Sequence, residues 1–94
     1  METLTVVEEK IDEQGIDTTG EAKVILFNDD WHTFDDVIIQ LIRAIHCTYK
    51  IAESMAWTVH NEGECRVYEG MVEECLSVSA VLEEIDLKTQ IDFG

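Results

Sequence analysis

The chain has 94 residues, of which 46% are hydrophobic, and this length and composition predict one domain with one modest core. Its 21 acidic and six basic side chains give a formal net charge of −15, which excludes nucleic acids and anionic membranes as natural partners and favours cationic groups. The three cysteines form no close pair, and the first residues contain no apolar segment of a signal peptide. We therefore expect a soluble, cytoplasmic protein with reduced thiols.

The chain divides into two parts by composition. Residues 1–21 carry many acids and few apolar side chains, and this bias predicts a flexible acidic tail. Residues 22–94 contain the periodic apolar patterns of a folded domain. The first of these patterns, over 22–27, predicts a buried strand.

A polar loop, Asn28-Asp29-Asp30, ends this strand, because Asn and Asp favour turns over ladder positions. Thr33 then offers its hydroxyl as a helix N-cap, and Asp36 completes a capping pattern three residues later. The loop is thus held between a strand end and a helix start. A fixed cluster of oxygen acceptors suits an ammonium group, a metal cation or a proton-transfer role.

Hydrophobic spacing predicts the remaining elements: helices over 34–46, 49–61 and 71–84, and strands over 64–68 and 89–93. Gly70 is expected to turn the chain into the third helix. The inward face of that helix is expected to carry Val72, Cys75, Leu76 and Leu82. The order β-α-α-β-α-β predicts an open α/β sandwich, in which three helices cover one face of a small three-stranded antiparallel sheet.

Two motifs lie some thirty residues apart, K-V-I-L-F-N-D-D over 23–30 and V-H-N-E-G over 59–63. Together they resemble the ClpS family, adaptors that deliver bacterial-type N-degron substrates to a Clp AAA+ protease. The similarity extends over 23–93. The run R-V-Y-E-G over 66–70, with Glu73 behind it, is similar to the variant of the family in photosynthetic bacteria.

The resemblance implies a site for the free amino terminus of a protein whose first residue is bulky and hydrophobic (Leu, Phe, Tyr or Trp). It implies that Asn28 and Asp29 hold the first peptide groups of the substrate. It implies that Asp30 and His60 receive the α-ammonium group, whose charge and three donors call for such acceptors. The apolar pocket for the first side chain would be lined by Phe34, Val37, Ala56 and Val59.

Two pocket positions depart from the family pattern. Many members have Met where this chain has Phe34, and Met is also common at the position of Ala56. Because Phe is more rigid than Met and Ala removes volume opposite it, we expect a pocket reshaped toward aromatic first residues. The expected partners are N-degron proteins and a ClpA-like or ClpC-like ATPase, and we expect a monomer without cofactor or metal.

Two other classes of function remain open. Asp29, Asp30 and His60 could form a metal site or an acid–base set, although the chain lacks a phosphate-binding loop, an H-E-x-x-H helix and a C-x-x-C pair. The chain could also be an acidic interaction domain that resembles the C-terminal domain of the ribosomal stalk protein. His32 is assigned to a surface or turn position, and the pattern leaves the place of Trp57 undecided.

Overall fold

A computed structural model gives the structure of the chain and describes residues 20–93. The predicted tail over 1–21 lies outside the described residues except for its last two. Six elements follow in the predicted order. Their bounds are β1 Glu21–Phe27, α1 Phe34–Ile45, α2 Tyr49–Glu62, β2 Glu64–Met71, α3 Val72–Glu83 and β3 Lys88–Asp92.

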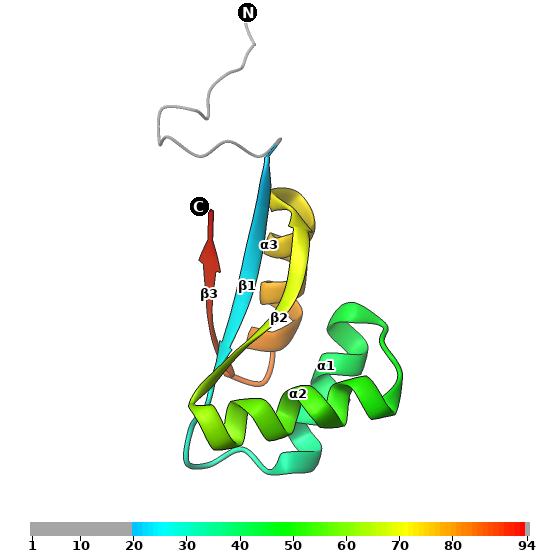
Figure 1. Ribbon diagram of the computed structural model, residues 1–94, viewed down its shortest axis with the longest axis vertical. Coiled ribbons are helices and arrows are strands. Elements are labelled where there is room, and N and C mark those ends of the chain that lie inside the picture. Colours follow the sequence, from blue (N-terminus) through cyan, green and yellow to red (C-terminus); the bar gives the residue numbers. More distant parts are fainter. Residues whose placement is uncertain (1–19, 94) are drawn as a thin grey trace, which may run out of the picture.

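The three strands form one antiparallel sheet in the order β2-β1-β3 (Figure 1). Every second residue of the central strand β1 is buried, and these residues are Ala22, Val24 and Leu26. The register between β1 and β2 shifts between Val24 and Ile25, which marks a bulge. The alternation buries one face of β1 under the helices, as a half-buried strand requires.

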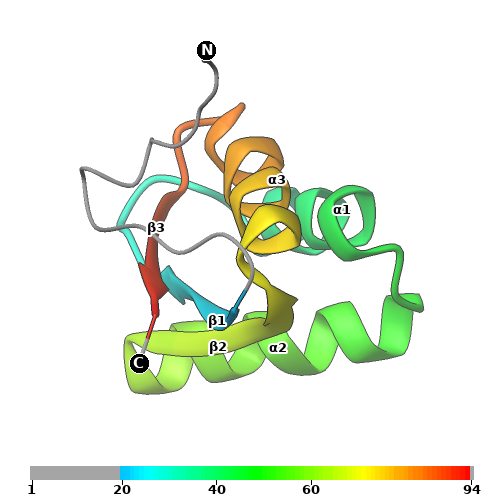
Figure 2. The same cartoon turned by 90° about the horizontal axis from the view of Figure 1, so that it is seen from above.

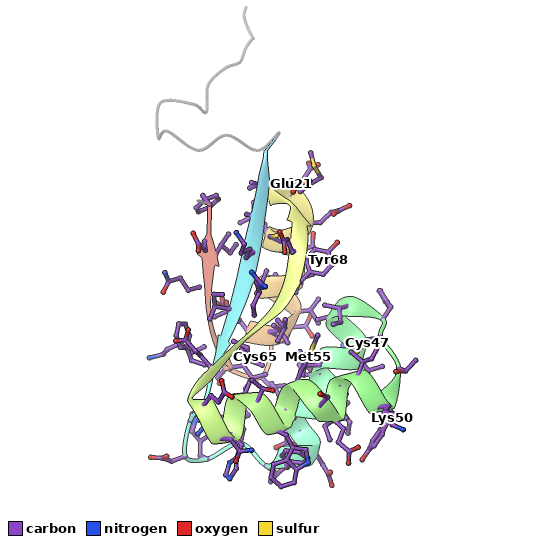
Figure 3. All side chains as sticks on the ribbon, in the orientation of Figure 1. Glu21, Cys47, Lys50, Met55, Cys65 and Tyr68 are labelled. Atoms are coloured by element: carbon purple, nitrogen blue, oxygen red, sulfur yellow. The ribbon has the colours of Figure 1, made fainter. Side chains whose placement is uncertain are left out.

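The helices form the second layer. Helix α3 contacts all three strands, and α1 lies beside α3, as Figure 2 shows, and also contacts α2. The buried polar residue of α1, Gln40, donates its amide to the Val81 carbonyl of α3 at 2.6 Å. Met55 points from α2 toward the core, whereas Lys50 on the same helix projects into solvent (Figure 3). The predicted open sandwich is confirmed.

Local signals define the helix ends that border the polar loop. Thr33 and Asp36 form the predicted capping box at the start of α1, with the Thr33 hydroxyl accepting from the Asp36 amide at 3.0 Å. Gly63 ends α2 with a φ of 90°, a left-handed conformation that costs glycine little. Both ends of the loop region are thus set by short-range chemistry.

Two local predictions were wrong. Gly70 does not turn the chain but pairs with Ala22 inside β2, which continues to Met71. Leu76 does not face the core, because 46% of its surface is exposed, whereas Val78 takes the inward position. Val72, Cys75 and Leu82 are buried as predicted, so the buried face of α3 differs from the predicted one at this position.

Candidate functional site

A pocket of about 490 Å³ opens where the loop after β1 meets the C-terminal half of α2. The backbone amide of Asn28 donates to the Gly63 carbonyl at 2.9 Å and joins these two segments. All eight residues that the sequence predicted for the site line this pocket, and His32, Thr33 and Trp57 line it as well. Residues far apart in the sequence are therefore brought together as predicted, although their binding roles remain predictions.

The inner part of the pocket is apolar. Phe34 and Val37 come from the first turn of α1, and Ala56 and Val59 come from α2 and are almost fully buried. The ring of Trp57, whose position the sequence left open, lies 4.8 Å from the ring of Phe34, measured between centroids. Trp57 is half exposed, so it forms part of the pocket wall and not of the core.

The mouth of the pocket is polar. Asn28, Asp30 and His60 are exposed, and within residues 20–93 their side chains make no hydrogen bond or ion pair. The His60 ring forms a T-shaped pair with the Trp57 ring, with 6.0 Å between centroids. One carboxylate, one amide and one imidazole are thus available to a ligand at the entrance.

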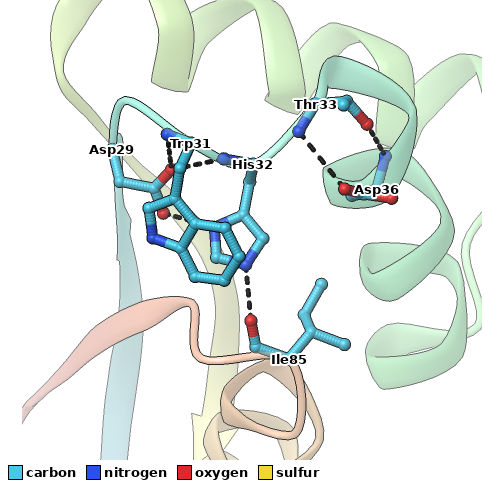
Figure 4. Close-up of polar contacts among 6 residues, drawn as sticks. All are labelled: Asp29, Trp31, His32, Thr33, Asp36 and Ile85. Atoms are coloured by element: carbon cyan, nitrogen blue, oxygen red, sulfur yellow. Dashed lines mark hydrogen bonds and ion pairs between the residues drawn. The ribbon is translucent and has the colours of Figure 1, made fainter.

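Asp29 differs from Asp30, because both of its carboxylate oxygens are already bonded (Figure 4). Oδ1 accepts from the backbone amides of Trp31 at 3.1 Å and His32 at 2.9 Å. Burial raises the pKa of Asp29, but the hydrogen bonds from His32 and Trp31 lower it by more, and the net pKa lies below 3.8. Asp29 is therefore an ionised residue that organises its own loop.

His32 was assigned to a surface or turn position; it lies in a bend of the loop, but its side chain is not at the surface. Its side chain is only 3% exposed and bridges two segments, with Nδ1 2.5 Å from Asp29 Oδ2 and Nε2 2.5 Å from the Ile85 carbonyl. Trp31 lies against the same ring, with 3.8 Å between centroids. The Asp-x-x-His spacing of the loop was the available sequence signal, but the partner in the turn after α3 lies 53 residues away.

The part of the chain covered by residues 20–93 holds no group of three or more His, Cys, Asp or Glu side chains that could bind a metal ion. Over the same residues, no helix combines the length and the apolar character needed to cross a bilayer. Cys75 is buried, Cys47 and Cys65 are partly buried, and all three are free.

Among solved structures, the chain is similar to Agrobacterium tumefaciens ClpS2 bound to L-phenylalaninamide. The TM-score is 0.70 at 16% sequence identity, and the match covers 78% of this chain and 98% of that one. This likeness shows that the two proteins share a fold.

Among curated proteins, the chain is similar to the E3 ubiquitin-protein ligase UBR2 of Homo sapiens and to that of Mus musculus. Each is 38% identical over 58 residues, which are 62% of this chain. The match spans only 3% of the length of either ligase. The similarity therefore concerns one short segment of a much larger protein.

A comparison with known families matches residues 17–90 to the family described as the ATP-dependent Clp protease adaptor protein ClpS. The match covers most of the chain and includes every element up to the middle of β3. It confirms the resemblance that the two sequence motifs indicated. The chain therefore belongs to the ClpS family of Clp protease adaptors.

Proposed function

We propose that the chain is an adaptor that binds proteins with a free, bulky hydrophobic N-terminal residue and delivers them to a Clp ATPase-protease. One observation carries the proposal: a polar mouth, whose Asn28, Asp30 and His60 side chains make no hydrogen bond within residues 20–93, opens into an apolar pocket of about 490 Å³. An amino-terminal residue has the matching pattern, a cationic group next to an apolar side chain. The family assignment supports this reading over a stalk-like interaction domain.

The polar mouth fits the chemistry of an α-ammonium group. That group offers three donors and one positive charge, which a carboxylate, an amide oxygen and an imidazole nitrogen can satisfy. Asp30, Asn28 and His60 supply these three groups at the pocket entrance. The Asp29 carboxylate accepts hydrogen bonds from two backbone amides and so fixes the loop that carries Asn28 and Asp30.

The apolar walls fit the first side chain of the substrate. Phe34 and Val37 form one wall, Ala56 and Val59 form the other, and Trp57 extends the Phe34 side. The ligand named for the similar Agrobacterium protein, L-phenylalaninamide, combines a free amine with an aromatic side chain. A ligand of this class is therefore the natural first probe.

Acetylation of the ligand provides the direct test. A fluorescent peptide that begins with free Phe is expected to bind, and the same peptide with an acetylated terminus should bind at least about tenfold more weakly, because charge and donors are lost. Fluorescence anisotropy measures both dissociation constants. Equal affinity for the two peptides would show that the pocket does not recognise the amino group.

The wall residues also predict a preference among first residues. Trp57 packs on Phe34 and stiffens this wall, while the small Ala56 leaves room opposite it, so Phe and Trp should bind more tightly than Leu. Ala56→Met, which fills that room, should reduce or reverse the preference. Titration of peptides that differ only in residue one measures it, and tighter binding of Leu by the unmodified protein would contradict it.

Delivery requires a second partner, for which we propose a ClpA-like or ClpC-like ATPase. The adaptor would act as a monomer in the cytoplasm, and the three free thiols support a reducing compartment. Degradation of a Phe-initiated reporter by the ATPase-protease should require the adaptor. An adaptor that binds the reporter without accelerating its degradation would separate recognition from delivery.

A further inference from the structure

The inference concerns the charge of His32. Its Nδ1 faces the Asp29 carboxylate and its Nε2 faces the Ile85 carbonyl, both at 2.5 Å. A backbone carbonyl accepts hydrogen bonds and cannot donate them, and the same is true of an ionised carboxylate. A neutral imidazole carries one N–H, so it would leave one nitrogen lone pair pointing at an acceptor oxygen. Only the imidazolium form donates to both partners.

We propose that His32 is held as an imidazolium and acts as a positioning residue, which fastens the amino-terminus-binding loop to the turn after α3. The binding consequence of this role rests on the function proposed above. His32 itself is not expected to contact the ligand's amino group. It acts through Asp29, whose carboxylate also fixes the backbone of the loop at Trp31 and at His32.

The surroundings favour the positive charge from each packed segment. Asp29 in the loop and Asp36 in α1 are acidic neighbours that act on the ring through their charge. The Ile85 carbonyl follows the C-terminal end of α3, where the helix dipole is negative, and the residues that flank Ile85 in the chain, Glu84 and Asp86, are also acidic. His60 of α2, which lines the same pocket, is the one basic group that faces the loop from that helix within the described residues.

These contacts determine whether the pKa of His32 is raised or lowered. Burial lowers the pKa of His32, but the Ile85 carbonyl, the Asp29 carboxylate and the charge of Asp36 outweigh it and raise the pKa above 6.5. The stabilisation from His32 is then complete below about pH 6.5, its unfolded pKa, and is lost as the pH rises through the raised folded value. The stabilisation from Asp29 is present above 3.8 and is lost as the pH falls through its lowered value.

The proton on His32 can be observed without any ligand. Nitrogen NMR of the free protein at pH 7 should show the signals of a histidine ring with both nitrogens protonated, and these signals should disappear in His32→Gln. His46→Asn is the matched control, because His46 is an exposed histidine with a φ of 57°, which Asn tolerates. A neutral His32 ring at pH 7 would overturn the proposal.

The binding experiment tests the positioning role. His32→Asn keeps a donor near Nδ1 and His32→Gln keeps one near Nε2, but neither carries charge, so each should bind the free Phe peptide roughly tenfold more weakly at pH 6.5. His46→Asn should bind like the unmodified protein. Circular dichroism of each variant is the control for folding.

The pH profile separates positioning from general damage. The affinity ratio of unmodified protein to His32→Gln should fall toward one as the pH rises through the pKa measured for His32, because His32 loses its charge there while every other titrating group is common to both proteins. A ratio that stays constant would overturn the positioning role. If even the unmodified protein fails to bind the peptide, the proposed function fails, while the charge of His32 is still decided by NMR.

Discussion

Asp30→Asn is expected to weaken binding of the free Phe peptide by roughly 10- to 100-fold, the effect of losing a charge-assisted hydrogen bond to an ammonium group. The substitution preserves the shape of the side chain, removes its charge and replaces one acceptor oxygen with an NH2 donor, which cannot accept from an ammonium group. Asp30 is exposed at the mouth of the pocket and has no bonded partner within residues 20–93, so its carboxylate remains available to the ligand. Anisotropy titration at pH 6.5 measures the loss.

Asp35→Asn is the matched control for this experiment. Asp35 is an exposed acid in the first turn of α1, close to Asp30 in the sequence, but it does not line the pocket. It should change the affinity less than about twofold, because an exposed charge acts only through a screened field. Equal losses in the two variants would mean that the overall negative charge attracts the peptide, without a specific contact at Asp30.

Leu82→Ala should lower the free energy of unfolding by about 2–5 kcal/mol. Leu82 is fully buried in α3, the helix that packs on all three strands, and truncation would leave a cavity at that contact. Leu and Ala have similar helix propensities, so the loss would report packing and not helix formation. Urea denaturation followed by circular dichroism measures it.

Leu76→Ala makes the same chemical change on the same helix at an exposed position. It should cost within about 0.5 kcal/mol, as is usual for surface substitutions. A loss at Leu76 as large as that at Leu82 would show that the buried face of α3 is the one that the sequence predicted. The pair of variants therefore tests directly whether Leu76 belongs to the buried face.

The local chemistry of the loop made much of the site predictable. Asn28 and the two acids after it end a strand in any context, and Thr33 with Asp36 starts a helix through bonds that span only three residues. The family motif then connected this loop with His60. Signals that act within one turn or within one motif were therefore sufficient to place the mouth of the pocket.

The failures share a different cause, because each depends on contacts between distant segments. In α3, the positions three and four residues after Val72 both satisfy a helical pattern, and only packing against the sheet selects Cys75 over Leu76. Gly70 was interpreted as a turn, yet it lies within β2 because it pairs with Ala22 of the distant strand β1.

His32 is a failure of the same kind with a functional consequence. Its Asp29 partner is three residues away, but burial of the ring depends on Ile85, which the sequence pattern cannot bring near. The tertiary fold thus converts an ordinary loop histidine into a bridge. Sequence patterns describe which groups are available, whereas long-range packing decides which of them are enclosed.

The backbone bond between the Asn28 amide and the Gly63 carbonyl has an evolutionary consequence. It ties the two halves of the pocket through main-chain atoms, so the frame does not depend on which side chains face the cavity. Substitutions at an exposed wall position such as Trp57 can therefore accumulate without dismantling the scaffold. Such substitutions would reshape the cavity while the main-chain architecture around it stays the same.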